Sequence, residues 1–80
     1  MSAYGGSNRR ASNVMLRILV NGKLDELDGP ITISDYLKLK GVQGNAVVER
    51  NLIIVKRDSY DQVQIQDNDQ LEIVQMMAGG

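Results

Sequence analysis

Cysteine and histidine are both absent from this sequence, and their absence excludes several kinds of site. A chain without cysteine forms no disulfide, so we expect a reducing compartment, the cytoplasm. The usual zinc ligands are missing, and so are the side chains that most often serve as catalytic bases and nucleophiles. We therefore expect no metal site, no bound cofactor and no catalytic residues of its own.

An excess of charge of one sign and long apolar runs are missing as well. Nine basic and ten acidic residues nearly cancel, which argues against a basic surface for nucleic acid. The longest apolar run, residues 52–55, is far shorter than the roughly 20 residues that span a bilayer. With 80 residues the chain is one small domain, expected to be a monomer when free.

Residues 1–13 differ in composition from the rest of the chain. They are mostly serine, glycine, asparagine, arginine and alanine, with no apolar periodicity. We expect them to be disordered, whether they are a native extension or a leader added for expression. Residues 14–80 are then the folded domain, which ends in a flexible Gly-Gly tail.

The first half of this domain has the pattern of a hairpin. Apolar side chains alternate over residues 14–20, which predicts a strand, and Asn21-Gly22 is a strong signal for a two-residue turn. A second strand is predicted over residues 23–27, with Leu24 and Leu27 directed inward. Asp25, Glu26 and Asp28 form an acidic group that we interpret as a solvated surface.

A short helix is predicted next. Thr32 or Ser34 can serve as its N-cap, and Gly41 ends it. An apolar stripe is expected to hold the helix against the sheet, formed by Ile33, Tyr36, Leu37 and Leu39.

Short strands follow the helix. They are predicted over residues 46–48 and 52–55, with a turn at 49–51 and an extended piece around Val63 and Ile65. Asn68 is expected to adopt the left-handed conformation in a tight turn at 67–69. A last strand over 71–76 directs Leu71 and Ile73 toward the helix. The pattern is α+β, with one sheet face covered by the helix and the other face open.

The sequence ends in Ala78-Gly79-Gly80. Glycine has no Cβ, so such a tail is thin enough to thread a narrow active site with its carboxylate unobstructed. Adenylation of the Gly80 carboxylate by ATP creates a good leaving group, and attack by a sulfur donor then leaves a thiocarboxylate. With no thiol in the chain, this carboxylate is the only plausible place for transferable sulfur.

Several segments resemble the ThiS family of sulfur carriers in thiamine biosynthesis. They are residues 18–22 (ILVNG), 46–51 (AVVERN), 53–57 (IIVKR), 65–74 (IQDNDQLEIV) and the diglycine end. The resemblance implies a β-grasp fold, as in ubiquitin, with a mixed sheet of four to five strands and one main helix packed on one face. Asn68 stands where the family usually has glycine, and Lys56 where it often has proline.

The resemblance also implies partners and a role. An E1-like adenylating enzyme of the ThiF type would consume ATP to activate Gly80. A cysteine desulfurase or another donor would supply sulfur indirectly, and a thiazole synthase of the ThiG type would receive it. The chain would then be a carrier, not an enzyme.

Within this scheme the residues near the end divide into two groups. Met77, Ala78 and Gly79 are expected to thread the partner's active site ahead of Gly80. Glu72, Val74 and Met76 lie on the open sheet face of the last strand and are the expected docking residues.

Two other functions stay open at this point. One is the small sulfur-carrier subunit of molybdopterin synthase, although residues 75–77 (QMM) lack the aromatics or prolines usual before the glycines of that family. The other is a ubiquitin-like protein modifier or a binding module. The basic pair Lys56-Arg57 is interpreted as solvated surface.

Overall fold

The computed structural model describes residues 15–42 and 44–75. The predicted disorder of residues 1–13 and the predicted flexible tail therefore lie outside the described residues. The elements, in chain order, are β1 (Leu16–Val20), β2 (Lys23–Leu27), β3 (Ile31–Thr32), α1 (Ile33–Leu39), β4 (Ala46–Arg50), β5 (Ile53–Val55), a 3₁₀ turn η1 (Arg57–Ser59), β6 (Gln64–Ile65) and β7 (Gln70–Gln75).

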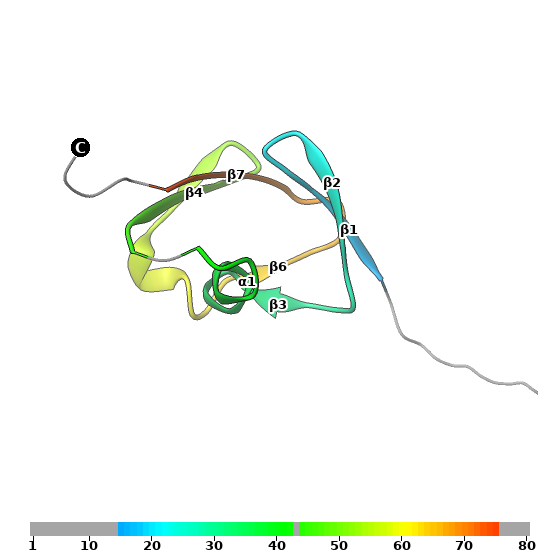
Figure 1. Ribbon diagram of the computed structural model, residues 1–80, viewed down its shortest axis with the longest axis horizontal. Coiled ribbons are helices and arrows are strands. Elements are labelled where there is room, and N and C mark those ends of the chain that lie inside the picture. Colours follow the sequence, from blue (N-terminus) through cyan, green and yellow to red (C-terminus); the bar gives the residue numbers. More distant parts are fainter. Residues whose placement is uncertain (1–14, 43, 76–80) are drawn as a thin grey trace, which may run out of the picture.

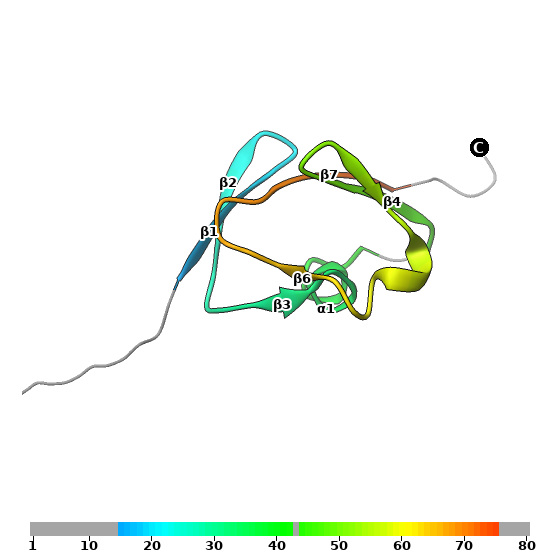
Figure 2. The same ribbon diagram turned by 180° about the vertical axis from the view of Figure 1, so that it is seen from behind.

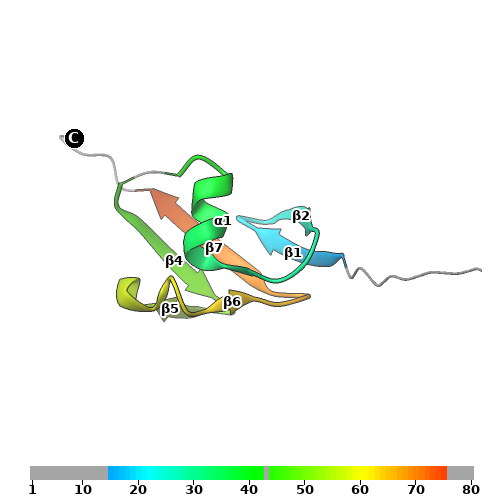
Figure 3. The same cartoon turned by 90° about the horizontal axis from the view of Figure 1, so that it is seen from below.

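A five-stranded mixed sheet with one helix across it forms the described part of the chain. Its strand order is β2-β1-β7-β4-β5, in which β1 and β7 are parallel and the other neighbours are antiparallel. The helix α1 lies on one side of this sheet, and no other helix covers the opposite side in the described residues (Figures 1 and 3). The predicted α+β architecture is confirmed.

The hydrophobic core lies between α1 and the inner face of the sheet. The buried apolar residues are Leu16, Ile18, Leu27, Ile33, Tyr36, Leu37, Ala46, Val48, Ile65 and Leu71. The alternation predicted for β1 and for β7 is confirmed, because strand residues two apart share a face.

Local turn chemistry accounts for the hairpin and the start of the helix. Asn21 and Gly22 have φ values of 51° and 83°, as a two-residue hairpin of this type requires. The Thr32 hydroxyl accepts a hydrogen bond from the Asp35 N–H at 3.1 Å, so Thr32 rather than Ser34 is the N-cap. Asn68 has a φ of 70°, as predicted.

Two predicted core positions are wrong. Leu24 is 65% exposed, because it lies an odd number of residues from the buried Leu27 and so faces the other side of β2. Leu39 is 64% exposed. At about 100° of rotation per residue, Leu39 is turned about 60° from Tyr36, away from the side of the helix on which the buried Ile33 and Leu37 lie.

The strand boundaries also differ in detail. β4 continues to Arg50, so the turn predicted at 49–51 is formed by Asn51 and Leu52, and β5 begins at Ile53. A second, two-stranded sheet pairs β3 with β6 beside α1 (Figure 2). The extended piece predicted around Val63 and Ile65 corresponds to β6. Strand β3 and its pairing with β6 were not predicted, since a strand of two residues shows no periodicity.

Candidate functional site around the last strand

Strand β7 leads toward the C-terminal residues that carry the predicted chemistry. It lies between β1 and β4 in the sheet (Figures 1 and 3). Its register with β4 runs from Leu71 opposite Arg50 to Gln75 opposite Ala46. The base of the tail is therefore attached to the folded domain through a paired strand.

The structure places two of the predicted docking residues where they were expected. Glu72 and Val74 point away from the core on the open sheet face, and Val74 is 56% exposed. Met76 lies outside the described residues, as do the predicted threading residues Met77, Ala78 and Gly79 and the predicted reactive residue Gly80. A docking role for any of them stays a prediction.

Val74 belongs to a larger apolar surface, which we call the open-face patch. Val47 lies directly opposite Val74 across the β4–β7 pair, and both are exposed. The strand register places three more exposed apolar side chains on the same face, namely Leu19, Leu24 and Ile54. Glu49 and Glu72 are opposite each other between them. The patch combines apolar area with adjacent carboxylates, which suits a partner surface that is apolar and carries cations.

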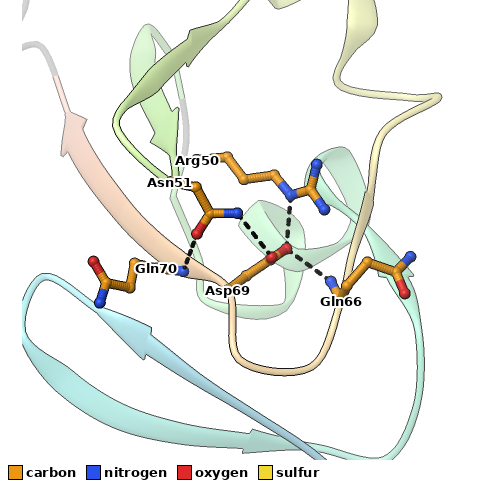
Figure 4. Close-up of polar contacts among 5 residues, drawn as sticks. All are labelled: Arg50, Asn51, Gln66, Asp69 and Gln70. Atoms are coloured by element: carbon orange, nitrogen blue, oxygen red, sulfur yellow. Dashed lines mark hydrogen bonds and ion pairs between the residues drawn. The ribbon is translucent and has the colours of Figure 1, made fainter.

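A buried carboxylate fixes the start of β7 (Figure 4). Asp69, which is 5% exposed, accepts hydrogen bonds from Arg50 Nε at 2.7 Å, Asn51 Nδ2 at 3.1 Å and the Gln66 N–H at 2.8 Å. The Asn51 side-chain oxygen in turn accepts from the Gln70 N–H at 2.9 Å. The network joins the β4–β5 turn to the first residue of β7.

The environment of Asp69 favours its charged form. Burial alone raises the pKa of this carboxyl, but the hydrogen bonds from Arg50, Gln66 and Asn51 outweigh it and lower the pKa below the ordinary value. Sequence reasoning had placed Asp69 only in a tight turn. The signal it missed is the pair of polar residues Arg50-Asn51 at the end of an apolar strand.

A second polar cluster lies between the β1–β2 hairpin and α1. Asp25 points inward from β2, where its Oδ2 accepts from the Tyr36 hydroxyl at 2.6 Å and from Lys40 Nζ at 3.0 Å. The interpretation of Asp25 as solvated surface is therefore wrong. The cluster lines a groove of about 470 Å³ that extends to Ile73 and Gln75.

Metal binding finds no support in the described part of the chain. Among residues 15–42 and 44–75 there is no group of three acidic, histidine or cysteine side chains that could hold an ion. In the same residues no helix is long and apolar enough to cross a membrane.

Comparison with known proteins gives consistent matches. The model of the ThiS family matches residues 18–80. A thiazole synthase from Paramagnetospirillum magneticum is 39% identical over 66 residues, which is 81% of this chain. The chain spans only 20% of the length of that relative.

Two solved structures agree with the fold. The crystal structure of the thiamine biosynthesis protein ThiS from Geobacter metallireducens has a TM-score of 0.69 at 28% identity, covering 81% of this chain and all of that one. A solution structure of a thiamine biosynthesis protein from Geobacter metallireducens gives the same TM-score and identity, covering 81% of this chain and 88% of the other. The predicted β-grasp fold is confirmed. Because the family model matches well over half of the residues, the chain belongs to the ThiS family.

Proposed function

We propose that this chain is a sulfur carrier of thiamine biosynthesis and that its working group is the carboxylate of Gly80. The observation that carries the proposal is the family match, which continues through the diglycine at residues 79 and 80. The described domain supports the same role, because the strand that leads to the tail is paired on both sides and the open sheet face carries exposed apolar residues.

The chemistry needs only the carboxylate and two reactants supplied by partners. A Gly80 oxygen attacks the α-phosphorus of ATP, pyrophosphate leaves, and an acyl adenylate is formed. Sulfur at the oxidation level of sulfide then attacks the acyl carbon, AMP leaves, and a thiocarboxylate remains. The adenylate is the step that makes the acyl carbon electrophilic, since a free carboxylate is a poor electrophile.

An E1-like enzyme of the ThiF type is the proposed adenylating partner. It docks on the open-face patch through Val74, Met76 and Glu72, while Met77, Ala78 and Gly79 thread its active site. The exposure of Val74 and its position on the strand that leads to the tail support this arrangement. ATP is consumed by the partner, and the carrier itself binds no cofactor.

Thiazole synthase of the ThiG type is the proposed recipient of the sulfur. A stretch of a protein named thiazole synthase is 39% identical to this chain and accounts for one fifth of that protein. Such a stretch within one polypeptide supports a direct partnership between carrier and synthase. A cysteine desulfurase or an equivalent donor supplies the sulfur indirectly. Where the sulfur arrives as a persulfide, its outer sulfur attacks the acyl carbon, AMP leaves, and a thiol reductant cleaves the resulting acyl disulfide to leave the thiocarboxylate.

Reconstitution with the cognate adenylating enzyme tests the proposal. With ATP alone, pyrophosphate release is expected. With ATP and a sulfide source, intact mass spectrometry should show the replacement of one oxygen by sulfur. Deletion of Gly80 should abolish both signals while the circular dichroism spectrum stays that of the folded domain.

Gly29→Ala is a matched control for the loss of a glycine. A Cβ added at Gly29 meets no atom within 4 Å, so this variant should be activated normally. Pyrophosphate release from the protein without Gly80 would contradict the proposal. A native protein that continues beyond residue 80 without processing would contradict it as well. Isopeptide conjugates in place of a thiocarboxylate would indicate a protein modifier.

A further inference from the structure

The side chain of Asn21 is bonded to both backbone groups of Ile73 on the last strand. Asn21 Nδ2 donates to the Ile73 carbonyl at 3.1 Å, and the Ile73 N–H donates to Asn21 Oδ1 at 2.8 Å. The two residues are 52 positions apart in the sequence. This is a two-bond bridge between the tip of the first hairpin and the strand that carries the tail.

The bridge continues the hydrogen bonding between β1 and β7 beyond the point where their backbone pairing stops. The parallel register of β1 with β7 covers Leu19 and Val20, and the Asn21 N–H still donates to the Leu71 carbonyl at 2.9 Å. The chain then turns away through Gly22 into β2. In place of a further residue of β1, the amide side chain of Asn21 supplies the donor and the acceptor that the backbone of Ile73 needs on this edge of β7.

Only asparagine satisfies both demands at this position. Its φ of 51° lies in the left-handed region, which glycine, asparagine and aspartate tolerate best. Glycine would fit the turn but has no side chain, and an ionised aspartate accepts hydrogen bonds without donating any. The turn therefore explains a small polar residue at position 21, whereas the contact with Ile73 explains the amide.

We propose that Asn21 is a positioning residue for the reactive end of the chain: its amide holds Ile73 so that β7 leaves the sheet in one direction, toward the partner's active site. The inference rests on the proposed function, because it takes Gly80 to be the group that the partner must reach. It concerns a residue far from the tail in sequence and outside the open-face patch.

The contact between Asn21 and Ile73 matters because a small change in the direction of β7 is magnified at the distant end of the tail. β7 is paired with β4 as far as Gln75, and Gly80 follows Gln75 by five residues, a reach of about 16 Å when a partner holds the segment extended. A tilt of about 10° of the end of β7 would displace the end of such an arm by about 3 Å. Restricting that direction before binding reduces the conformational freedom that must be lost when the tail enters the active site.

Kinetics with the adenylating enzyme separate positioning from stability. Asn21→Gly removes the amide and keeps the turn, so it should raise KM for the carrier about three- to tenfold. The kcat at saturation should be unchanged, because the enzyme itself then holds the tail. A purely structural loss would instead lower the active fraction and the melting temperature without raising KM.

Asn68→Gly is the matched control. Asn68 is also an asparagine with positive φ in a tight turn, and its side chain makes no hydrogen bond to another described residue. KM for this variant should equal that of the unaltered chain. Equal KM values for Asn21→Gly and Asn68→Gly would overturn the inference.

Amide hydrogen exchange tests the bridge without any partner. The Ile73 N–H should exchange faster in Asn21→Gly, whereas the amide at position 21 should keep its protection through Leu71. Unchanged exchange at Ile73 would overturn the inference and leave the proposed function standing. Absence of pyrophosphate release from the unaltered chain would overturn the proposed function, and the positioning role with it, whatever the exchange at Ile73.

Discussion

The Tyr36 hydroxyl donates a hydrogen bond of 2.6 Å to Asp25, and this contact connects the middle of α1 to the first hairpin. Lys40 Nζ lies 3.0 Å from the same carboxylate oxygen. Burial, followed by the bond to Asp25, raises the pKa of Tyr36. The bond from Tyr36, followed by that from Lys40, lowers the pKa of Asp25. The inward carboxylate of β2 is thus kept charged by donors from the helix.

Loss of this donor should be measurable as a loss of stability. Tyr36→Phe leaves the aromatic ring in the core and removes only the bond to a charged acceptor, which should cost about 1–2 kcal/mol in the free energy of unfolding. Urea denaturation followed by circular dichroism measures it. Tyr60→Phe is the matched control, because the Tyr60 hydroxyl donates to a neutral carbonyl, that of Ala46. A larger cost for Tyr60→Phe than for Tyr36→Phe would contradict this interpretation.

Acid should weaken the hydrogen-bond network around Asp69. Its pKa in the folded chain lies below the ordinary value of 3.8. The stability it contributes is therefore fully present above that value, and is lost as the pH falls from 3.8 through the lower folded-state pKa. Asp69→Asn should cost about 3 kcal/mol at neutral pH, because it leaves Arg50 half-buried without its carboxylate.

The pH dependence distinguishes this account from simple loss of packing. The difference in unfolding free energy between the unaltered chain and Asp69→Asn should narrow as the pH falls below 3.8. A difference that stays constant down to acid pH would show that the charge of Asp69 is not what stabilises the turn. Asp28→Asn, at an exposed carboxylate, should change stability at neutral pH by less than about 0.5 kcal/mol.

The open-face patch can be tested with one introduced charge. Val74→Lys places a cation beside Glu49 and Glu72 on an exposed position, so the fold should survive. Because the variant loses apolar contact and repels a partner surface that carries cations, KM for the adenylating enzyme should rise about tenfold or more, which corresponds to about 1.4 kcal/mol of binding free energy. Leu39→Lys introduces the same charge at a similarly exposed apolar position on α1. Equal effects of the two variants would show that the patch is not the docking surface.

Local turn chemistry made several features of the fold predictable from sequence. Asn21-Gly22 and Asn68 were assigned correctly, because a preference for positive φ belongs to the residue itself and needs no tertiary contact. The alternation that places Ile18 inside and Arg17 outside is likewise local.

Positions that depend on the meeting of distant segments could not be assigned in this way. Hydropathy favoured Leu24 over Asp25 for the inward side of β2, and only the tertiary structure shows that Tyr36 and Lys40 satisfy the carboxylate there. Asp69 shows the same limit, since its partners come from the β4–β5 turn and from Gln66. The chemistry assigned to Gly80 was inferred from residue types and family resemblance, and it stays a prediction.

The β4–β5 turn contains a residue whose replacement should stabilise the protein. Leu52 has a φ of 72° and is 83% exposed, so a branched apolar side chain occupies a left-handed position without packing in return. Such a conformation costs an L-residue roughly 1–2 kcal/mol, whereas glycine adopts it freely but has more entropy to lose on folding. Leu52→Gly should therefore raise the free energy of unfolding by up to about 1 kcal/mol, measured by urea denaturation.

Ile53→Gly is the control for this prediction. Ile53 is one residue further along, in an extended strand, so its replacement by glycine should lower the free energy of unfolding. If both variants were destabilised equally, Leu52 would have to make a stabilising contact that outweighs its strained backbone.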